Sequence, residues 1–336
     1  MALTYSHFMD IKDTNTLVST IEAIAPYNVG WALTDRVGDI NNLASARLRT
    51  LSYKEFDIPK KSGGTRRITA PVGKLKDVLK CLSVILAPYY EPCECVHGFT
   101  TQRSVASNAS VHMGKNYVLN IDLKDFFPSI TATRVQKALQ KHGLNPEVAH
   151  LISRLTTLPM AIEGSQTLRN ALPQGSPCSP LLSNMVCADL DRKLMGLARR
   201  FRVDYTRYAD DMTFSSNHHV YAAGEEFFTE LRRIIEDCGF TINERKTRLQ
   251  KRGSRQEVTG VIVNEKTNAH RSFRKNLRAA VFAAETFGCT RKEYNSIMGK
   301  ISYLSMLLNE DRGCIYKYKA IMSKVMIRNN PCHILA

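Results

Sequence analysis

The chain has 336 residues, of which 43% are hydrophobic and 23% are charged, a composition that supports two or three packed subdomains and excludes a small stapled domain or a disordered tail. Its 47 Lys and Arg residues outnumber 31 Asp and Glu, so the formal net charge is +16 and the pI is near 9.5. Residues 245–336 contain 19 of the basic residues and only 6 acids. This excess predicts a polyanionic partner such as a nucleic acid.

The cysteines and the N-terminus indicate a reducing compartment. The nine cysteines are odd in number and follow no disulfide framework, and the first residues lack the basic and apolar regions of a signal peptide. No apolar stretch approaches the ~18 residues that span a bilayer. We therefore expect a cytoplasmic protein without a membrane role. Cys93 and Cys95 lie near His97 but lack a second pair, so we do not expect structural zinc.

The first part of the chain predicts helices and one basic hairpin. Residues 1–52 are interpreted as an N-terminal helical extension without recognisable chemistry. Residues 54–71 predict a β-hairpin with a Gly-Gly turn, and residues 74–90 predict a packing helix that ends at Pro88. Five cations surround the turn of the hairpin: Lys54, Lys60, Lys61, Arg66 and Arg67.

The middle of the chain predicts short strands that end in acids. Residues 117–123 form an apolar, strand-favouring run that ends near Asp122, and residues 203–216 predict a hairpin with Asp210 and Asp211 at its tip. Residues 258–264 predict one more strand. Helices are expected at 131–142, 146–157, 180–200 and 220–238, and two or three basic helices within 272–328.

Asp122, Asp210 and Asp211 would meet if their two elements shared a sheet. Clustered carboxylates repel one another, and divalent cations relieve that repulsion. Open oxygen sites suit Mg²⁺, with Mn²⁺ as an alternative, and two ions about 4 Å apart can activate a 3′-hydroxyl and stabilise a leaving pyrophosphate. The pattern predicts nucleotidyl transfer, although an isolated Asp-Asp tip is more often a solvated turn.

Five motifs follow one another along the chain: the basic hairpin at 60–67, NIDLKDFF at 120–127, LPQGSPCSP at 172–180, YADD at 208–211 and GFTINERKT at 239–247. Their order and spacing resemble those of reverse transcriptases. The resemblance implies an α+β right-hand polymerase fold with an antiparallel palm sheet and a helical thumb. The implied divisions are fingers at 53–116 with part of 131–170, a catalytic palm at 117–263, and a basic, RNA-binding thumb at 264–336.

The resemblance also implies catalytic roles. Asp122 and Asp210 would bridge two Mg²⁺ ions, Asp211 would support them less directly, and the carbonyl of Leu123 would complete the second site. Lys246 matches the lysine that acts as general acid to pyrophosphate. A surface lysine is more often only solvated.

Cations of the basic hairpin are expected to bind the triphosphate of a dNTP. Lys61 and Arg66 are the first candidates, with Arg66 offering bidentate geometry and Lys61 a point charge. Arg67 is a close rival. A solvated surface hairpin is the alternative.

Three further residues are expected near the incoming nucleotide. The resemblance places Phe127 against the sugar 2′ position, with a core phenylalanine as the alternative, and it implies that Gln174 and Gly175 contact the templating pair and the nucleotide. Gly175 would let the backbone approach a flat partner such as a base pair. A helix cap at Ser179 explains only the end of LPQGSPCSP.

Two elements narrow the resemblance to bacterial retron reverse transcriptases. Asn108, Ala109 and His112 match an N-A-x-x-H element, and Val258, Thr259 and Gly260 match a V-T-G element. The resemblance implies that these residues grip a structured noncoding RNA, and that the enzyme primes from a guanosine 2′-hydroxyl to make branched RNA-DNA, called msDNA. Each element alone is more often an ordinary loop or strand.

The basic C-terminal region supports an RNA partner. Four cations recur at helical spacing and form one face: Arg271, Arg274, Lys275 and Arg278. The implied partners are a cognate msr-msd RNA and its RNA-DNA product, dNTPs, a host ribonuclease H, and a separately encoded effector in antiphage defence. The alternatives are another bacterial reverse transcriptase, of diversity-generating or defence type, and a non-catalytic RNA-binding scaffold or antitoxin.

Overall fold

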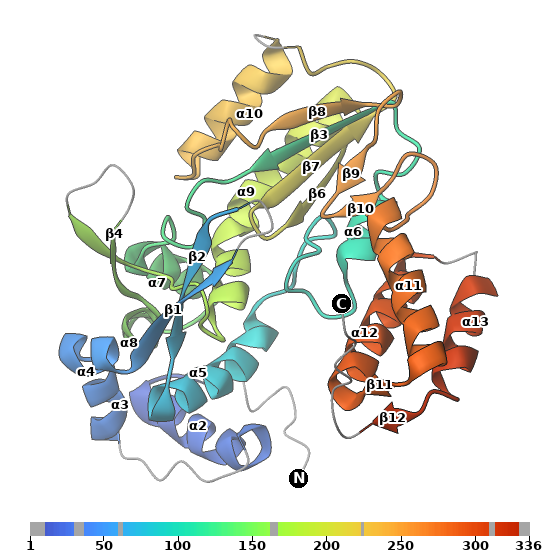
Figure 1. Cartoon of the computed structure of the whole chain (residues 1–336). Helices are drawn as coiled ribbons and strands as arrows, with labels where there is room; N and C mark the ends of the chain where they lie inside the picture. Colours follow the sequence, from blue (N-terminus) through green and yellow to red (C-terminus); the bar gives the residue numbers. More distant parts are fainter. Residues whose placement is uncertain are drawn as a thin grey trace.

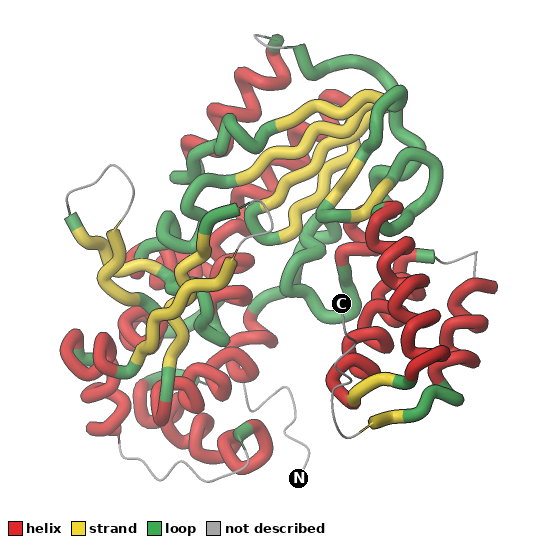
Figure 2. Tube along the Cα trace, viewed as in Figure 1, coloured by secondary structure: helices red, strands yellow, loops and turns green. Residues whose placement is uncertain are grey.

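The computed structural model of the chain describes residues 11–29, 37–59, 63–161, 167–222, 225–308 and 313–328. These residues form an α+β structure, in which an antiparallel sheet joins a mostly helical region from the first half of the chain to three helices near its end (Figures 1 and 2). The predicted fold class is confirmed. Lys61 of the basic hairpin lies outside the described residues.

The central sheet is antiparallel and has the strand order β6-β7-β3-β8. The middle strand, β3, is buried on both faces, because Leu119 and Ile121 enter one hydrophobic core while Val118 enters a second. The predicted strand at 117–123 and hairpin at 203–216 are confirmed, whereas β8 is not evident from the sequence. The strands are β3 (Tyr117–Asp122), β6 (Asp204–Tyr208), β7 (Asp211–Ser216) and β8 (Arg248–Lys251).

Two helices cover one face of this sheet. α9 (Ser179–Phe201) packs on β6, and α10 (Glu226–Asp237) packs on α9 (Figure 1). The apolar side of α10 meets the sheet through Phe227, whose ring lies 5.4 Å from that of Phe214, centroid to centroid. α10 begins at Glu226, later than the sequence predicts. This aromatic contact holds the β6-β7 hairpin against the helices.

The first half of the chain surrounds the predicted basic hairpin. β1 and β2 pair from Tyr53 with Pro71 to Pro59 with Thr65, which confirms the hairpin. α2 packs on α5 and α8, and the same hydrophobic core continues into the sheet. The elements are α2 (Thr14–Asn28), α3 (Val37–Ala44), α4 (Ala46–Leu51), β1 (Tyr53–Pro59), β2 (Thr65–Pro71), α5 (Gly73–Leu86), η1 (Ala87–Tyr89), α6 (Val105–Ser110), α7 (Ala132–Lys141), α8 (Pro146–Thr156), β4 (Leu158–Ala161) and β5 (Leu168–Ala171).

The single strand predicted at 258–264 is wrong. The structure has two short strands, β9 (Glu257–Val258) and β10 (Val261–Ile262), which pair in antiparallel fashion. Thr259 and Gly260 form the two-residue turn between them, with φ values of 46° and 80°. Positive φ at both central positions is the backbone that a tight hairpin needs, and the glycine makes it accessible.

Three helices near the end of the chain build a second hydrophobic core. They are α11 (Arg271–Phe287), α12 (Arg291–Leu307) and α13 (Gly313–Met322), and they confirm the helices predicted within 272–328. Leu277 and Ile301 are fully buried between them. A short parallel pair, β11 (Cys289–Thr290) with β12 (Ile327–Arg328), lies beside these helices.

No helix in the described part of the chain is long and apolar enough to cross a membrane. Eight cysteines fall within that part, and all of them are free thiols. The side chains there form no metal-binding group around Cys93 and Cys95. His218 bonds to the backbone carbonyl of Phe201 through Nε2, at 3.0 Å.

Candidate active site

Three carboxylates meet at one end of the central sheet. Asp122, the last residue of β3, lies directly opposite Asp211, the first residue of β7. The N–H of Leu123 donates to the carbonyl of Asp210, at 3.1 Å, and so joins the end of β3 to the hairpin tip. Ala209 at that tip has φ of 58°. Strand pairing therefore brings together acids that are almost ninety residues apart in the sequence.

The two tip carboxylates repel one another and Asp122, and the nearby cations Lys246, Arg66 and Arg248 offset this repulsion only in part. Removal from solvent raises the pKa of Asp210, and the neighbouring charge of Asp122 raises it further. Asp211 keeps contact with solvent at its outer edge, yet desolvation by the surrounding protein, together with Asp210 and Asp122, raises its pKa to about 7. Such a cluster favours either a bound proton or a bound cation.

Lys246 supplies a cation to the third carboxylate. Its Nζ donates to Asp122 Oδ1 at 2.8 Å, and Asn243 Nδ2 donates to Asp122 Oδ2 at 3.0 Å. Although partial burial alone would lower it, the hydrogen bond and charge of Asp122 raise the pKa of Lys246. Both oxygens of Asp122 are therefore engaged by side chains that follow α10.

The donor set at this end of the sheet fits divalent cations by its chemistry. It offers three carboxylates together with the carbonyl of Leu123, to which no donor among the described residues is bonded. As placed, no three acidic, histidine or cysteine side chains of those residues converge on one point. A cation bound at Asp122 would lie close to the Lys246 ammonium on Oδ1, and the two positive charges would repel each other.

A cleft of about 740 Å³ opens in front of the carboxylates. Its walls include Arg66, Phe127, Gln174 and Lys246, four of the residues expected there from the sequence. The turn at Thr259 and Gly260 lies on its rim. The arrangement gives an acidic floor facing cationic and aromatic side chains.

The two arginines of the basic hairpin point in different directions. Arg66 lines the cleft, whereas Arg67 lies 3.8 Å from Glu55 and 3.7 Å from Asp57 in exposed ion pairs. Neighbouring residues of a strand face opposite sides of the hairpin. Only Arg66 is therefore placed to meet a ligand in the cleft.

The close backbone approach expected at Gly175 exists, but its partner is protein. A Cβ at Gly175 would lie 2.8 Å from Ile68 Cγ2 and 3.1 Å from the Thr69 carbonyl, and the φ of 125° requires glycine. The N–H of Thr69 donates to the Gln174 carbonyl, at 2.8 Å. Gly175 therefore docks β2 onto the loop before α9, and because Gly175 keeps exposed surface, its approach to a base pair stays a prediction.

The start of α9 also differs from the simple cap considered for Ser179. The N-cap residue is Cys178, and the Ser179 hydroxyl donates to the Pro173 carbonyl at 2.7 Å. This bond closes the loop of residues 173–179 on itself. The bond thereby fixes the loop that contains Gln174.

A buried ion pair supports the hairpin tip from behind. Arg207 and Asp191 have no exposed surface, and the guanidinium donates twice to the carboxylate, at 2.7 Å from both Nε and Nη2. Its Nη1 donates to the Ala209 carbonyl and to Asn184 Oδ1, each at 3.1 Å. A Cβ at Gly98 would lie 2.6 Å from the Ala209 N atom. The tip is thus held by α9 and by the loop at 95–98.

Asn108 and His112 are buried, with exposed fractions of 1% and 0%. The His112 ring bonds to Ser215 Oγ at 2.7 Å and to Thr206 Oγ1 at 2.8 Å, while Asn108 Nδ2 donates to Thr259 Oγ1 at 3.3 Å. Val258 is also fully buried. Direct RNA contact by these three side chains is therefore corrected to a positioning role, which leaves Thr259 and Gly260 at the cleft.

Several cleft residues were missed by the sequence reasoning. Phe99 is 45% exposed with φ of 59°, and its ring lies 6.5 Å from the rings of Phe127 and Tyr208. Arg245 and Arg248 add positive charge to the same wall. Phe99 lies in the polar segment HGFTTQRS at 97–104, and a lone aromatic among polar residues was the signal that could have identified it. The four cations of α11 line a different cavity.

Comparison with known proteins identifies one family, and the similar proteins belong to that same family. Residues 58–270 match the family described as reverse transcriptase (RNA-dependent DNA polymerase). The Retron Mx65 reverse transcriptase of Myxococcus xanthus is 38% identical over 269 residues, which are 78% of this chain and 62% of that protein. The Retron Ec86 reverse transcriptase of Escherichia coli is 32% identical over 69% of this chain and 68% of that protein. A structure of telomerase from Candida albicans, with a fragment of telomeric RNA, matches 79% of this chain and 56% of that one, at 12% identity and a TM-score of 0.45.

Proposed function

The chain belongs to the reverse transcriptase family, as a retron-type member, and from this membership and the cleft we propose that it is an RNA-directed DNA polymerase. The observation that carries the proposal is the pairing of Asp122 with Asp211 beside Asp210, at the floor of a cleft with cationic and aromatic walls. The chain spans less than two thirds of the length of the Mx65 relative.

Asp122, Asp210 and Asp211 are the residues that would hold two Mg²⁺ or Mn²⁺ ions, with the Leu123 carbonyl as a further oxygen. The raised pKa values of the two tip acids support a site that gains from added positive charge. When bound, such ions lower the pKa of a primer hydroxyl and neutralise charge on the leaving pyrophosphate. Lys246, once released from Asp122, would donate a proton to that pyrophosphate.

The incoming dNTP would lie between the basic hairpin and the carboxylates. Arg66 would bind its triphosphate, for which the guanidinium geometry is suited. Phe127 and Phe99 would close the sugar side of the cleft, and Gln174 would face the base pair. Lys61 stays a candidate for the triphosphate from sequence, and Arg67 is the weaker one because acids of β1 already engage it.

The identity of the RNA partner and of the product is the more specific part of the proposal. We propose fingers at residues 53–116 with part of 131–170, a palm at 117–263 and a thumb at 264–336, with RNA on the basic thumb. We propose a cognate msr-msd RNA, priming from a 2′-hydroxyl, and msDNA as product, because the relatives are retron reverse transcriptases and the sequence carries the retron-like elements at 108–112 and 258–260. We extend the proposal to a bacterial cytoplasmic setting, with a host ribonuclease H and a separate effector acting in antiphage defence.

The test is to express the chain with its adjacent noncoding locus and isolate short DNA joined covalently to RNA. The expected result is a debranchable RNA-DNA species that disappears in Asp210→Ala/Asp211→Ala. Asp204→Asn is the matched control, because Asp204 lies in the same hairpin but pairs with Lys115 at the other end of β6. It should leave the product unchanged.

The other outcomes separate the parts of the proposal. Activity on a primed RNA template without any branched product would retain the polymerase and reject the retron product. Absence of both, in a folded protein that binds RNA, would contradict the polymerase and favour a non-catalytic scaffold.

A further inference from the structure

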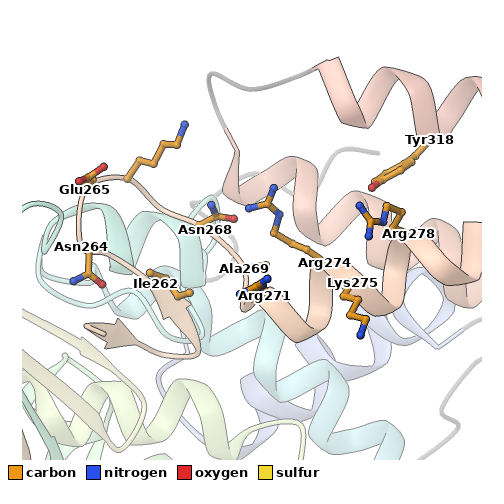
Figure 3. A pocket seen from close by; sticks show the side chains of 11 residues that line it. Ile262, Asn264, Glu265, Asn268, Ala269, Arg271, Arg274, Lys275, Arg278 and Tyr318 are labelled. Atoms are coloured by element: carbon orange, nitrogen blue, oxygen red, sulfur yellow. The ribbon is translucent and has the colours of Figure 1, made fainter. Parts of the chain in front are cut away.

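A second cavity lies at the start of α11, away from the carboxylates. It measures about 730 Å³ and is formed by three separate segments: the loop after β10, the first two turns of α11, and Tyr318 of α13 (Figure 3). Its volume falls within the roughly 300–1,000 Å³ of sites that enclose a small ligand. The sequence predicted a cationic helix face here, and the structure adds a hollow with a third wall.

The charge of this cavity is strongly one-sided. Five exposed cations line it: Lys266, Arg271, Arg274, Lys275 and Arg278. Within the described part of the chain, none of the five forms an ion pair. The one carboxylate in the lining is Glu265, on the rim away from Tyr318 (Figure 3). An anion entering the cavity would therefore meet cations that have no competing partner there.

The start of α11 adds to this preference for an anion. Its N-cap residue, His270, provides no side-chain cap, and its first turn contains no acid. Cations in a first turn are unfavourable against the positive end of the helix dipole. A phosphate at this end of the helix would offset that repulsion. It would also accept hydrogen bonds from the N–H groups of the first turn, which have no partner within the helix.

One aromatic and one polar side chain of the cavity, Tyr318 and Asn268, suit a nucleic-acid base. The hydroxyl end of Tyr318 points toward Arg274 and Arg278, so one edge of its half-buried ring borders the cationic space (Figure 3). Asn268 is anchored by backbone hydrogen bonds to Ile262 at 2.9 and 3.0 Å, and its buried Oδ1 has no hydrogen-bond partner among the described residues. Because this oxygen has no exposed surface, the amide has to turn into the cavity before it can accept a hydrogen bond from a base amino group.

We propose that this cavity binds one unstacked nucleotide of an RNA, with its phosphate on the α11 arginines and its base against Tyr318 near Asn268 Oδ1. The proposal rests on the proposed function only in taking RNA as the partner. Proteins recognise unpaired RNA nucleotides by stacking splayed bases on aromatic rings. A regular duplex backbone would need only the exposed cationic face, and would leave the concave space and Tyr318 unused.

The test compares two RNA hairpins that differ by a single unpaired adenosine in the stem, using fluorescence anisotropy. Tyr318→Leu should weaken binding of the bulged hairpin about tenfold, the typical loss for one stacked base, and binding of the paired hairpin less than twofold. Tyr318→Phe keeps a ring and should retain most of the selectivity. Tyr316→Leu is the matched control on the same helix, because Tyr316 is 64% exposed and lies outside the cavity.

A second pair of variants tests the phosphate. Arg274→Gln should reduce the salt dependence of bulged-hairpin binding by about 0.7 in the slope of log K against log salt. Arg291→Gln removes the corresponding first-turn cation of α12, which is outside the cavity, and should not change the selectivity for the bulge. With 2-aminopurine as the unpaired base, binding should change its fluorescence in the unaltered chain and not in Tyr318→Leu.

Equal weakening of both hairpins by Tyr318→Leu, with a normal unfolding temperature, would overturn the proposal in favour of a duplex-binding surface. Equal affinity of the unaltered chain for both hairpins would also overturn it. Incorporation of dNTPs on a primed RNA template by the unaltered chain is measured in parallel. Bulge selectivity without incorporation would reject the polymerase and keep the cavity assignment, and incorporation without selectivity would do the reverse.

Discussion

Lys246 occupies the place on Asp122 that a metal ion would take. Its Nζ lies 2.8 Å from Asp122 Oδ1, so in this structure the lysine neutralises the carboxylate. A divalent cation on Asp122 would repel this ammonium, and an ammonium that moves away would be free to act as the proposed acid. One residue would therefore oppose metal binding and assist the chemistry.

We predict that Lys246→Met separates these two effects. Metal affinity should increase several-fold, because Asp122 no longer has a competing ammonium, while the turnover rate should fall by about 10²-fold through loss of general acid catalysis. Calorimetric titration with Mn²⁺ and single-nucleotide incorporation measure the two quantities. Lys251→Met, at the far end of β8, is the control. Unchanged metal affinity would mean that the ion pair does not compete with the metal.

His112 makes the stability of the sheet depend on pH. Burial lowers its pKa to about 3, from an ordinary value of 6.5, so the ring is neutral in the folded chain. The unfolded chain binds a proton at this ring below pH 6.5. Its contribution to stability is therefore complete above that pH and is lost as the pH falls toward 3.

We predict that His112→Gln reduces this loss. The free energy of unfolding of the unaltered chain should fall more steeply with decreasing pH, by about 1.4 kcal/mol per pH unit for this histidine. Denaturant unfolding between about pH 6 and pH 4 measures the slope. His97 is present in both chains, so its own contribution to the pH dependence cancels when the two slopes are compared. Equal slopes would show that His112 is not kept neutral by the fold.

At the scale of elements, the loop before α9 fixes the basic hairpin through Gly175. We predict that Gly175→Ala lowers the unfolding temperature and raises KM for dNTP, because the new Cβ would push against Ile68 and Thr69 and displace Arg66 with β2. Strain of this kind costs about 1–3 kcal/mol. Gly196→Ala in α9 is the matched control. Nothing lies within 4 Å of a Cβ there, so this helical alanine should stabilise the chain. A normal KM in Gly175→Ala would contradict the docking role.

The Arg207–Asp191 pair joins α9 to the hairpin tip. We predict that Arg207→Met and Asp191→Leu each cost about 3–5 kcal/mol of stability, because each leaves a buried charge alone. The double variant should recover most of that stability, but not polymerase activity, since no guanidinium would hold the Ala209 carbonyl. Denaturant unfolding and nucleotide incorporation test both halves. A double variant with full activity would show that the tip needs no such support.

Local patterns were sufficient for the strands and helices that carry clear periodicity, and they failed where long-range contacts decide the structure. The alternation around β6 and β7 predicted the hairpin, and Pro88 predicted the end of α5. Residues 258–262 were predicted as one strand because Thr259 and Gly260 form only a two-residue interruption between valines. The positive φ values of both residues instead make a tight turn. The polar strand β8 has no apolar pattern, and it exists because it pairs with β3.

The site was predictable as a set of acids, but not as a complete cleft. Asp122, Asp210 and Asp211 follow from strand ends and a hairpin tip. The burial of His112 depends on its contacts with β6 and β7, and that of Asn108 on the β9-β10 turn, which no local pattern contains. The same is true of Phe99, whose exposure comes from the docking of its loop onto Arg207.

At the scale of the whole molecule, two hydrophobic cores meet at β3. One contains the helices of the first half of the chain with α9 and α10, and the other contains α11 to α13. The acidic floor of the cleft lies at the end of this shared strand, and the basic residues concentrate on the second core. This distribution would bring an RNA to the carboxylates from the side of α11.

The most direct measurement is dNTP incorporation on a primed RNA template by the purified chain with Mg²⁺, compared with Asp122→Asn, Asp210→Asn and Asp204→Asn. We predict incorporation by the unaltered chain and by Asp204→Asn, and incorporation at background level in the other two variants. Incorporation that persists in folded Asp122→Asn or Asp210→Asn, or that is absent from the unaltered chain, would contradict the assignment of these carboxylates as the centre of a polymerase.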